Sequence, residues 1–175
     1  MPNKLTIGIV VAAVAMAGLV AFSYMPKQSV SPEEKIENFH LQYSRQTLIN
    51  GGEAGGLYTD KADILTIENN GSASYLATDS DGKQVSERKF NLTTDTLRSL
   101  EGLLSETGFM QIPQTDYNAG ANVSTYTKYD LQVSLNGQDK RLDWVNQTSG
   151  GSVPAIILNV GSRLDQIIVN GTGNS

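Results

Sequence analysis

Apolar and polar residues alternate along much of the chain after residue 38, which is the pattern of strands with one buried face. The first such run begins at Phe39, and Asn70-Gly71 and Asn136-Gly137 separate later runs. Asn-Gly links of this kind favour tight hairpins between antiparallel neighbours. The strands predicted are 39 to about 49, 62–69, 72–79, a run ending near 92, and the two runs within 129–144.

Two other segments repeat their apolar residues with the helical period of 3.6. Thr93 or Thr94 caps the first helix and Gly108 stops it, whereas Pro154 opens the second, which ends at Asn170-Gly171. Each apolar stripe must be buried against other elements. The sequence therefore predicts an α+β fold, a mostly antiparallel sheet of five to six strands with two helices packed on one face. The stripes are Leu97, Leu100, Leu104 and Ile157, Val160, Leu164, Ile167.

Residues 5–25 carry no formal charge. About 20 apolar residues cross a hydrocarbon core as a helix, so residues 1–26 are predicted to be an N-terminal transmembrane helix. The alternative is a cleaved signal peptide, with Ala21-Phe22-Ser23 as the processing site. Either interpretation places the rest outside the cytoplasm. The expected organisation is a single-pass cell-membrane protein with a juxtamembrane spacer or short helix (27–38), an extracytoplasmic domain (39–169) and a disordered tail (170–175).

The amino-acid composition limits the kinds of functional site that the chain can carry. The chain has no cysteine, which excludes disulfides and thiolate sites, and its net charge of −5 disfavours nucleic acid as a partner. His40 is the single histidine and is expected on a strand surface. Asp79-Ser80-Asp81-Gly82 starts like a calcium loop, but Phe90 occupies the place of the required glutamate, so a tight turn is expected. We predict no catalytic, cofactor-binding or metal-ligating residue, and a protein that is not an enzyme.

Five Asn-x-Ser/Thr sequons follow the apolar segment, where composition alone gives about two. They are candidate glycosylation sites of an extracytoplasmic protein, although turns and Ser/Thr-rich strands also generate such triplets incidentally. The acceptors are Asn70, Asn91, Asn122, Asn146 and Asn170.

Residues 51–56 form a glycine-rich tip that matches no phosphate-binding loop. Loops on a packed scaffold commonly carry binding functions. The tip is therefore the candidate partner-contact loop, together with the polar stretches 114–124 and 147–153. Its residues are Gly51, Gly52, Glu53, Gly55 and Gly56.

The order of these features resembles emfourin-like proteins, small single-domain inhibitors of thermolysin-type metalloproteases. The resemblance is carried by the glycine-rich tip, residues 97–113, the tyrosine-led hairpin 129–144 and the final helix 153–168. It implies the same α+β fold and a protease as the class of partner. Three features depart from the family: the N-terminal anchor, a longer hairpin region at 62–92, and a tip without the usual aromatic residue.

Two functions are consistent with these observations. The first is a membrane-anchored, non-enzymatic module that binds a protein partner. The alternative is an accessory structural subunit of a membrane or cell-envelope complex, in which small residues such as Gly8 and Ala12 pack the anchor helix against a neighbour.

Overall fold

The computed structural model describes residues 38–50, 56–113, 117, 123–146 and 152–173. Within these ranges the chain forms an antiparallel sheet, two α-helices and one 3₁₀ turn. In chain order the elements are β1 (Phe39–Asn50), β2 (Leu57–Glu68), β3 (Ser72–Thr78), β4 (Gln84–Asn91), α2 (Thr94–Glu106), η1 (Phe109–Gln111), β5 (Thr125–Leu135), β6 (Gln138–Val145) and α3 (Ala155–Thr172).

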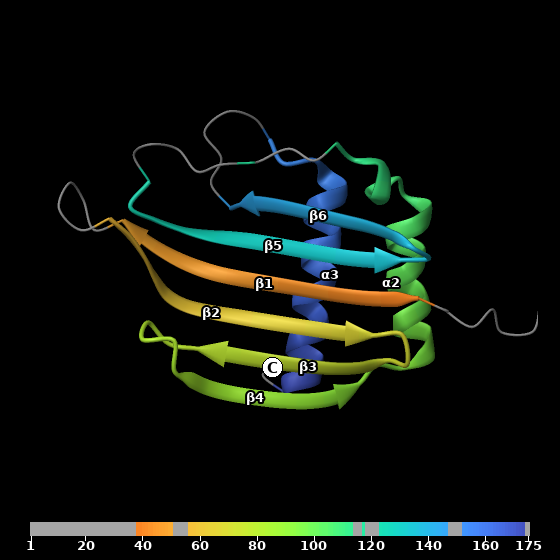
Figure 1. Cartoon of the computed structure of the whole chain (residues 1–175), viewed down its shortest axis with the longest axis horizontal. Coiled ribbons are helices and arrows are strands. Elements are labelled where there is room, and N and C mark those ends of the chain that lie inside the picture. Colours follow the sequence, from red (N-terminus) through yellow and green to blue (C-terminus); the bar gives the residue numbers. More distant parts are fainter. Residues whose placement is uncertain (1–37, 51–55, 114–116, 118–122, 147–151, 174–175) are drawn as a thin grey trace, which may run out of the picture. The chain divides into compact units, whose positions relative to one another are not determined.

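The sheet has the strand order β4-β3-β2-β1-β5-β6, so β1 lies in its interior between β2 and β5 (Figure 1). Three of its connections are tight hairpins whose turns need positive φ. Gly71 has φ +82°, while Asn136 and Gly137 have φ +50° and +80°, as expected for the Asn-Gly turns. In the β3–β4 connection, Gly82 has φ +73°. The predicted fold, an antiparallel sheet with both helices on one face, is confirmed.

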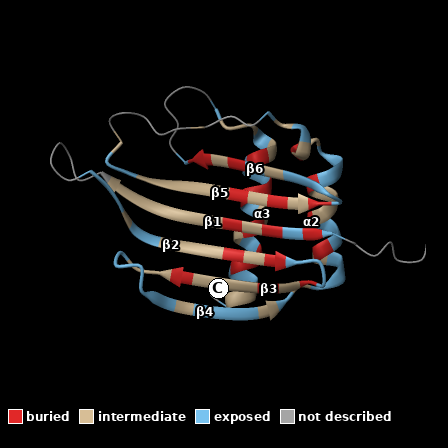
Figure 2. Cartoon of the chain, viewed as in Figure 1, coloured by how far each residue is buried: buried red, intermediate tan, exposed pale blue. Residues whose placement is uncertain are grey.

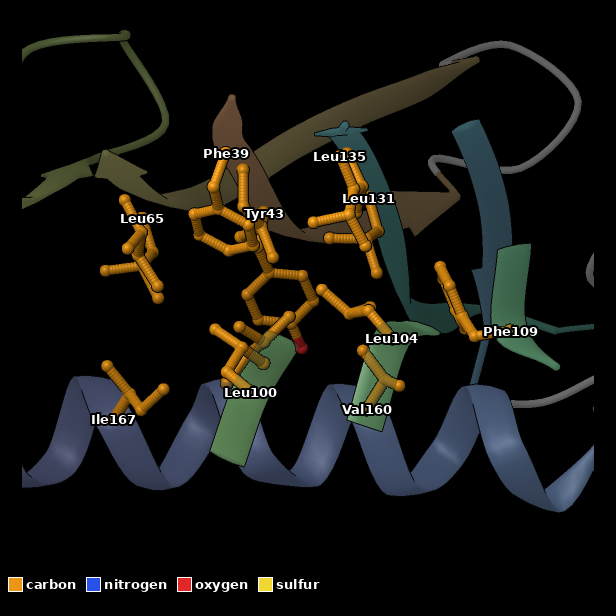
Figure 3. Packing of buried hydrophobic residues seen from close by; sticks show 14 of the residues in the cluster. Phe39, Tyr43, Leu65, Leu100, Leu104, Phe109, Leu131, Leu135, Val160 and Ile167 are labelled. Atoms are coloured by element: carbon orange, nitrogen blue, oxygen red, sulfur yellow. The ribbon is translucent and has the colours of Figure 1, made fainter. Parts of the chain in front are cut away.

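The core lies between the sheet and the two helices (Figure 3). The predicted leucine stripe of α2 and the apolar stripe of α3 are both buried. They pack against the inward side chains of the central strands, among them Tyr43, Leu65 and Leu131, which are fully buried. Each such side chain contributes about 1.5–3 kcal/mol by leaving water. Trp144 is 2% exposed and belongs to this core.

Three predicted boundaries are wrong. Strand β5 begins at Thr125 rather than at residue 129, because residues 125–128 also pair with β1. Strand β2 begins at Leu57 rather than residue 62, because residues 57–61 pair with β1 although their own pattern alternates poorly. Helix α3 continues to Thr172, so residues 170–172 are helical and not a disordered tail. Close packing of Gly171 against the Phe90 ring holds this last turn. The Thr172 hydroxyl also donates to the Ile168 carbonyl at 2.8 Å, and left-handed Gly173 ends the helix.

The predicted anchor (1–26) and residues 27–37 of the spacer lie outside the described residues. In the ranges that the structure describes, no helix combines the length and the apolar character needed to cross a membrane.

Candidate functional site

Burial divides strands β1, β2 and β5 into two halves along their length (Figure 2). In β1 the buried residues Phe39, Leu41 and Tyr43 stand at the start of the strand, and from Ser44 onward the side chains are partly exposed. The same holds for β2 and β5, whose buried residues lie in the half that the helices cover. The other half of these strands extends beyond the helix layer (Figure 1).

We call this extension the projecting end and define it by Leu48, Ile49, Leu57, Tyr58 and Tyr126. Ile49 is paired with Tyr58 on β2, and Leu48 is paired with Tyr126 on β5. Residues directly opposite in antiparallel strands point to the same face of a sheet. Apolar side chains therefore occupy both faces of the projecting end.

Two of these side chains are among the most exposed large hydrophobic residues that the structure describes. Leu57 is 58% exposed and Tyr58 is 49% exposed. Apolar surface kept in water costs roughly 25 cal/mol for each Å², and its concentration at one place marks an interaction surface. The projecting end is therefore the best candidate for contact with another protein.

The candidate glycine-rich loop connects β1 to β2 at the projecting end. Gly56 is exposed and has φ +63°, a conformation that favours glycine. Gly51, Gly52, Glu53 and Gly55 lie outside the described residues, as do most residues of the stretches 114–124 and 147–153.

An ion-pair network joins the sheet to α3 where the buried half meets the projecting end. The two terminal nitrogens of Arg45 contact Asp63 of β2 at 2.7 Å and Asp165 of α3 at 3.1 Å. The hydroxyl of Tyr43 donates to Asp165 at 3.0 Å, and that of Tyr75 donates to Asp63 at 2.8 Å. One arginine therefore links two elements that are far apart in sequence, through charge-assisted hydrogen bonds.

The phenols of this network remain protonated over a wide pH range. Burial, and then the hydrogen bond to Asp63, raise the pKa of Tyr75 to about 12. Burial and the negative charge of Asp165 raise the pKa of Tyr43 still further. Tyr43 also belongs to an aromatic layer in which Tyr129 stacks on Trp144 with ring centroids 5.1 Å apart. The two terminal nitrogens of Arg45 and the two phenols are therefore all hydrogen-bonded to carboxylates, while the buried Nε of Arg45 has no partner among the described residues. These hydrogen bonds hold the base of the projecting end in place.

Other residues singled out from the sequence have local roles. His40 is exposed, and its Nδ1 lies 3.2 Å from a Glu68 oxygen. The Asp79 carboxylate accepts hydrogen bonds from the backbone N–H groups of Asp81 and Lys83, which accounts for the turn. Among the described residues, no group of three or more His, Asp or Glu side chains is placed to hold a metal ion.

The described sequon asparagines are all exposed, whereas Asn122 lies outside the described residues. Asn70 lies in the β2–β3 turn and Asn91 ends β4. Asn146 follows β6, and Asn170 lies in the last turn of α3.

Sequence reasoning missed the Arg45 network and the apolar residues of the projecting end. One signal was available: the alternation Phe39, Leu41, Tyr43 continues to Arg45, which puts a cation on the inward face and calls for an acidic partner. Nothing local identifies Asp63 and Asp165 as those partners.

Comparison of the chain with models of known protein families, and with curated proteins, found no match.

Proposed function

We propose that this chain is a membrane-anchored, extracytoplasmic binding module without catalytic activity, and that it holds a protein partner through the projecting end. The observation that carries the proposal is the exposure of Leu57 and Tyr58 beside the glycine-rich loop. Aromatic and aliphatic side chains of this kind supply most of the energy of protein contacts when a partner buries them.

The construction of the site supports the proposal in two ways. The Arg45 network and the aromatic layer fix the strands at their base, so little order has to be gained on binding. The glycine-rich loop adds a backbone that can follow the shape of a partner. The apolar segment 5–25 would hold the domain at the membrane.

The resemblance to emfourin-like proteins suggests a thermolysin-type metalloprotease as the first partner to test. We expect the full-length chain in detergent to bind such an enzyme and slow its hydrolysis of a peptide substrate. The double variant Leu57→Ser with Tyr58→Ser should lose at least tenfold in affinity, since two exposed anchors of about 1–2 kcal/mol each are removed.

Val85→Ser provides the matched control, because Val85 is 61% exposed but lies on β4, away from the projecting end. If the protease does not bind, the same three proteins serve for affinity capture from solubilised membranes. A partner retained equally by all three would contradict the assignment of the projecting end. If all three proteins co-migrate with a membrane complex to the same extent, the structural-subunit alternative is favoured instead.

A further inference from the structure

We propose that Asn70 and Asn91 carry N-linked sugars, and that these sugars cover the unpaired edge of β4. This inference rests on the extracytoplasmic location in the proposed function. It deepens that function, because it assigns one end of the domain to sugars and leaves the other end for the protein partner.

The fold brings three sequons from distant parts of the sequence to one corner. In the sheet, Ser72 of the first sequon is paired with Asn91 of the second. The backbone N–H of Leu92 also donates to the carbonyl of Gly71 at 2.9 Å. Asn91 and Asn170 line the same surface pocket, of about 320 Å³. We call this region the sequon corner.

The side-chain amides of Asn70 and Asn91 are suited to modification in the folded domain. Asn70 is exposed, and its Oδ1 accepts a hydrogen bond from the Ser72 N–H at 2.9 Å. That bond occupies the oxygen and leaves the Nδ2 atom for a sugar. Asn91 is exposed at the end of β4. By the alternation of the strand, its side chain lies on the face opposite to the helices, with Glu87 and Lys89.

The donor of the sugar is a lipid-diphosphate-linked oligosaccharide. The Nδ2 atom forms a bond to the anomeric carbon of the first sugar, while the bond from that carbon to the diphosphate oxygen breaks. The Nδ2 atom loses one proton and the lipid diphosphate is the leaving group. No electron transfer is involved, and the amide Oδ1 keeps its acceptor role.

Asn170 differs, although it lies at the same corner. Its Oδ1 accepts from Gln166 within the helix, and the hydroxyl of its sequon partner Thr172 donates to the Ile168 carbonyl. A Cβ atom at Gly171 would lie 2.3 Å from the Phe90 ring, so this turn is packed tightly against β4. An enzyme could reach this triplet only after the end of α3 unwound.

The sugars would protect a vulnerable part of the sheet. In the described sheet, β4 is paired only with β3, so its outer edge offers unpaired N–H and C=O groups. Val85, near the start of this strand and away from Asn91, is 61% exposed. Such an edge is a template for strand addition between copies. The β2–β3 turn that holds Asn70 and the projecting end lie at opposite ends of β2. Sugars at the sequon corner therefore leave the proposed contact site uncovered.

Modification and topology are tested on one sample. The full-length chain is produced in a host that N-glycosylates extracytoplasmic proteins, and glycopeptides are identified by mass spectrometry. Protease treatment of sealed cells reports on which side the domain lies. We expect sugars at Asn70 and Asn91, the first lost in Ser72→Ala and the second in Asn91→Gln, with Asn170 mostly unmodified. An external domain without sugars at Asn70 and Asn91, or with sugars at Asn146 alone, overturns this inference. An internal domain overturns the proposed location itself.

Whether the sugars prevent self-association through the edge of β4 is tested separately, by sedimentation. The Ser72→Ala, Asn91→Gln double variant should self-associate, with a sedimentation mass about twice that of the glycosylated protein. Adding Val85→Lys should return it to the monomer, because a charge on the edge disfavours strand addition. A double variant that stays monomeric at high concentration would refute the protective role.

Discussion

Close packing of α3 on Trp144 makes a quantitative prediction. A Cβ atom added at Gly161 would lie 3.1 Å from the Cζ2 atom of Trp144. Trp144 is 2% exposed and stacked on Tyr129, so its ring has no free space to move into. Overpacking of this kind costs about 1–3 kcal/mol. Gly161→Ala should therefore destabilise the domain despite the higher helix propensity of alanine.

Gly102 of α2 provides the matched control. A Cβ atom there meets only the end of the Glu106 side chain, at 3.9 Å. Both substitutions gain the same helix propensity, about 0.5–1 kcal/mol, so the difference between the two variants isolates the packing term. We expect Gly102→Ala to stabilise the domain, and Gly161→Ala to fall about 1–3 kcal/mol below it.

The measurement is urea unfolding of a fragment that begins at residue 36, since residues 36–175 form one compact unit. Trp144 is the only tryptophan, so its fluorescence reports loss of the core directly. A difference of 1 kcal/mol also shifts the melting temperature by roughly 3–5 °C. If Gly161→Ala proves as stable as Gly102→Ala, the close contact between α3 and Trp144 is not present in solution.

Three further predictions concern the core and the Arg45 network. Leu104→Ala should cost about 2–5 kcal/mol by urea unfolding, because a fully buried side chain leaves a cavity. Arg45→Met should cost on the order of 2 kcal/mol, since Asp63 loses its partly buried partner. Lys89→Met, which breaks an exposed ion pair with Glu87, serves as the control and should cost under about 1 kcal/mol. If Arg45→Met and Lys89→Met cost the same, the Arg45 network does not stabilise the domain. The raised pKa of Tyr75 means that the unfolded chain loses this proton first, so stability should fall as pH rises above about 10 and up to about 12. Tyr75→Phe should weaken that fall in unfolding experiments between pH 9 and 11.5, and an unchanged pH profile would refute the coupling.

Local sequence patterns predicted only part of the candidate site. The sequence indicated the glycine-rich loop because glycines report backbone freedom without any tertiary contact. It did not indicate Leu57 and Tyr58, since residues 57–61 carry no clear strand pattern and become a strand only by pairing with β1. The long-range pairs of Arg45 were equally hidden, because Asp165 reaches it only after α3 packs across the sheet.

The sequence alone determined the elements of the covered half and their hairpins. Alternation marks one buried face, the 3.6 period marks one buried stripe, and Asn-Gly turns fix antiparallel neighbours, all within short stretches of chain. Only the tertiary structure decided that β1 lies inside the sheet, that the strands extend beyond the helices, and that three sequons meet at one corner. Those features depend on contacts between residues far apart in sequence, and local periodicity carries no information about which distant surfaces will meet.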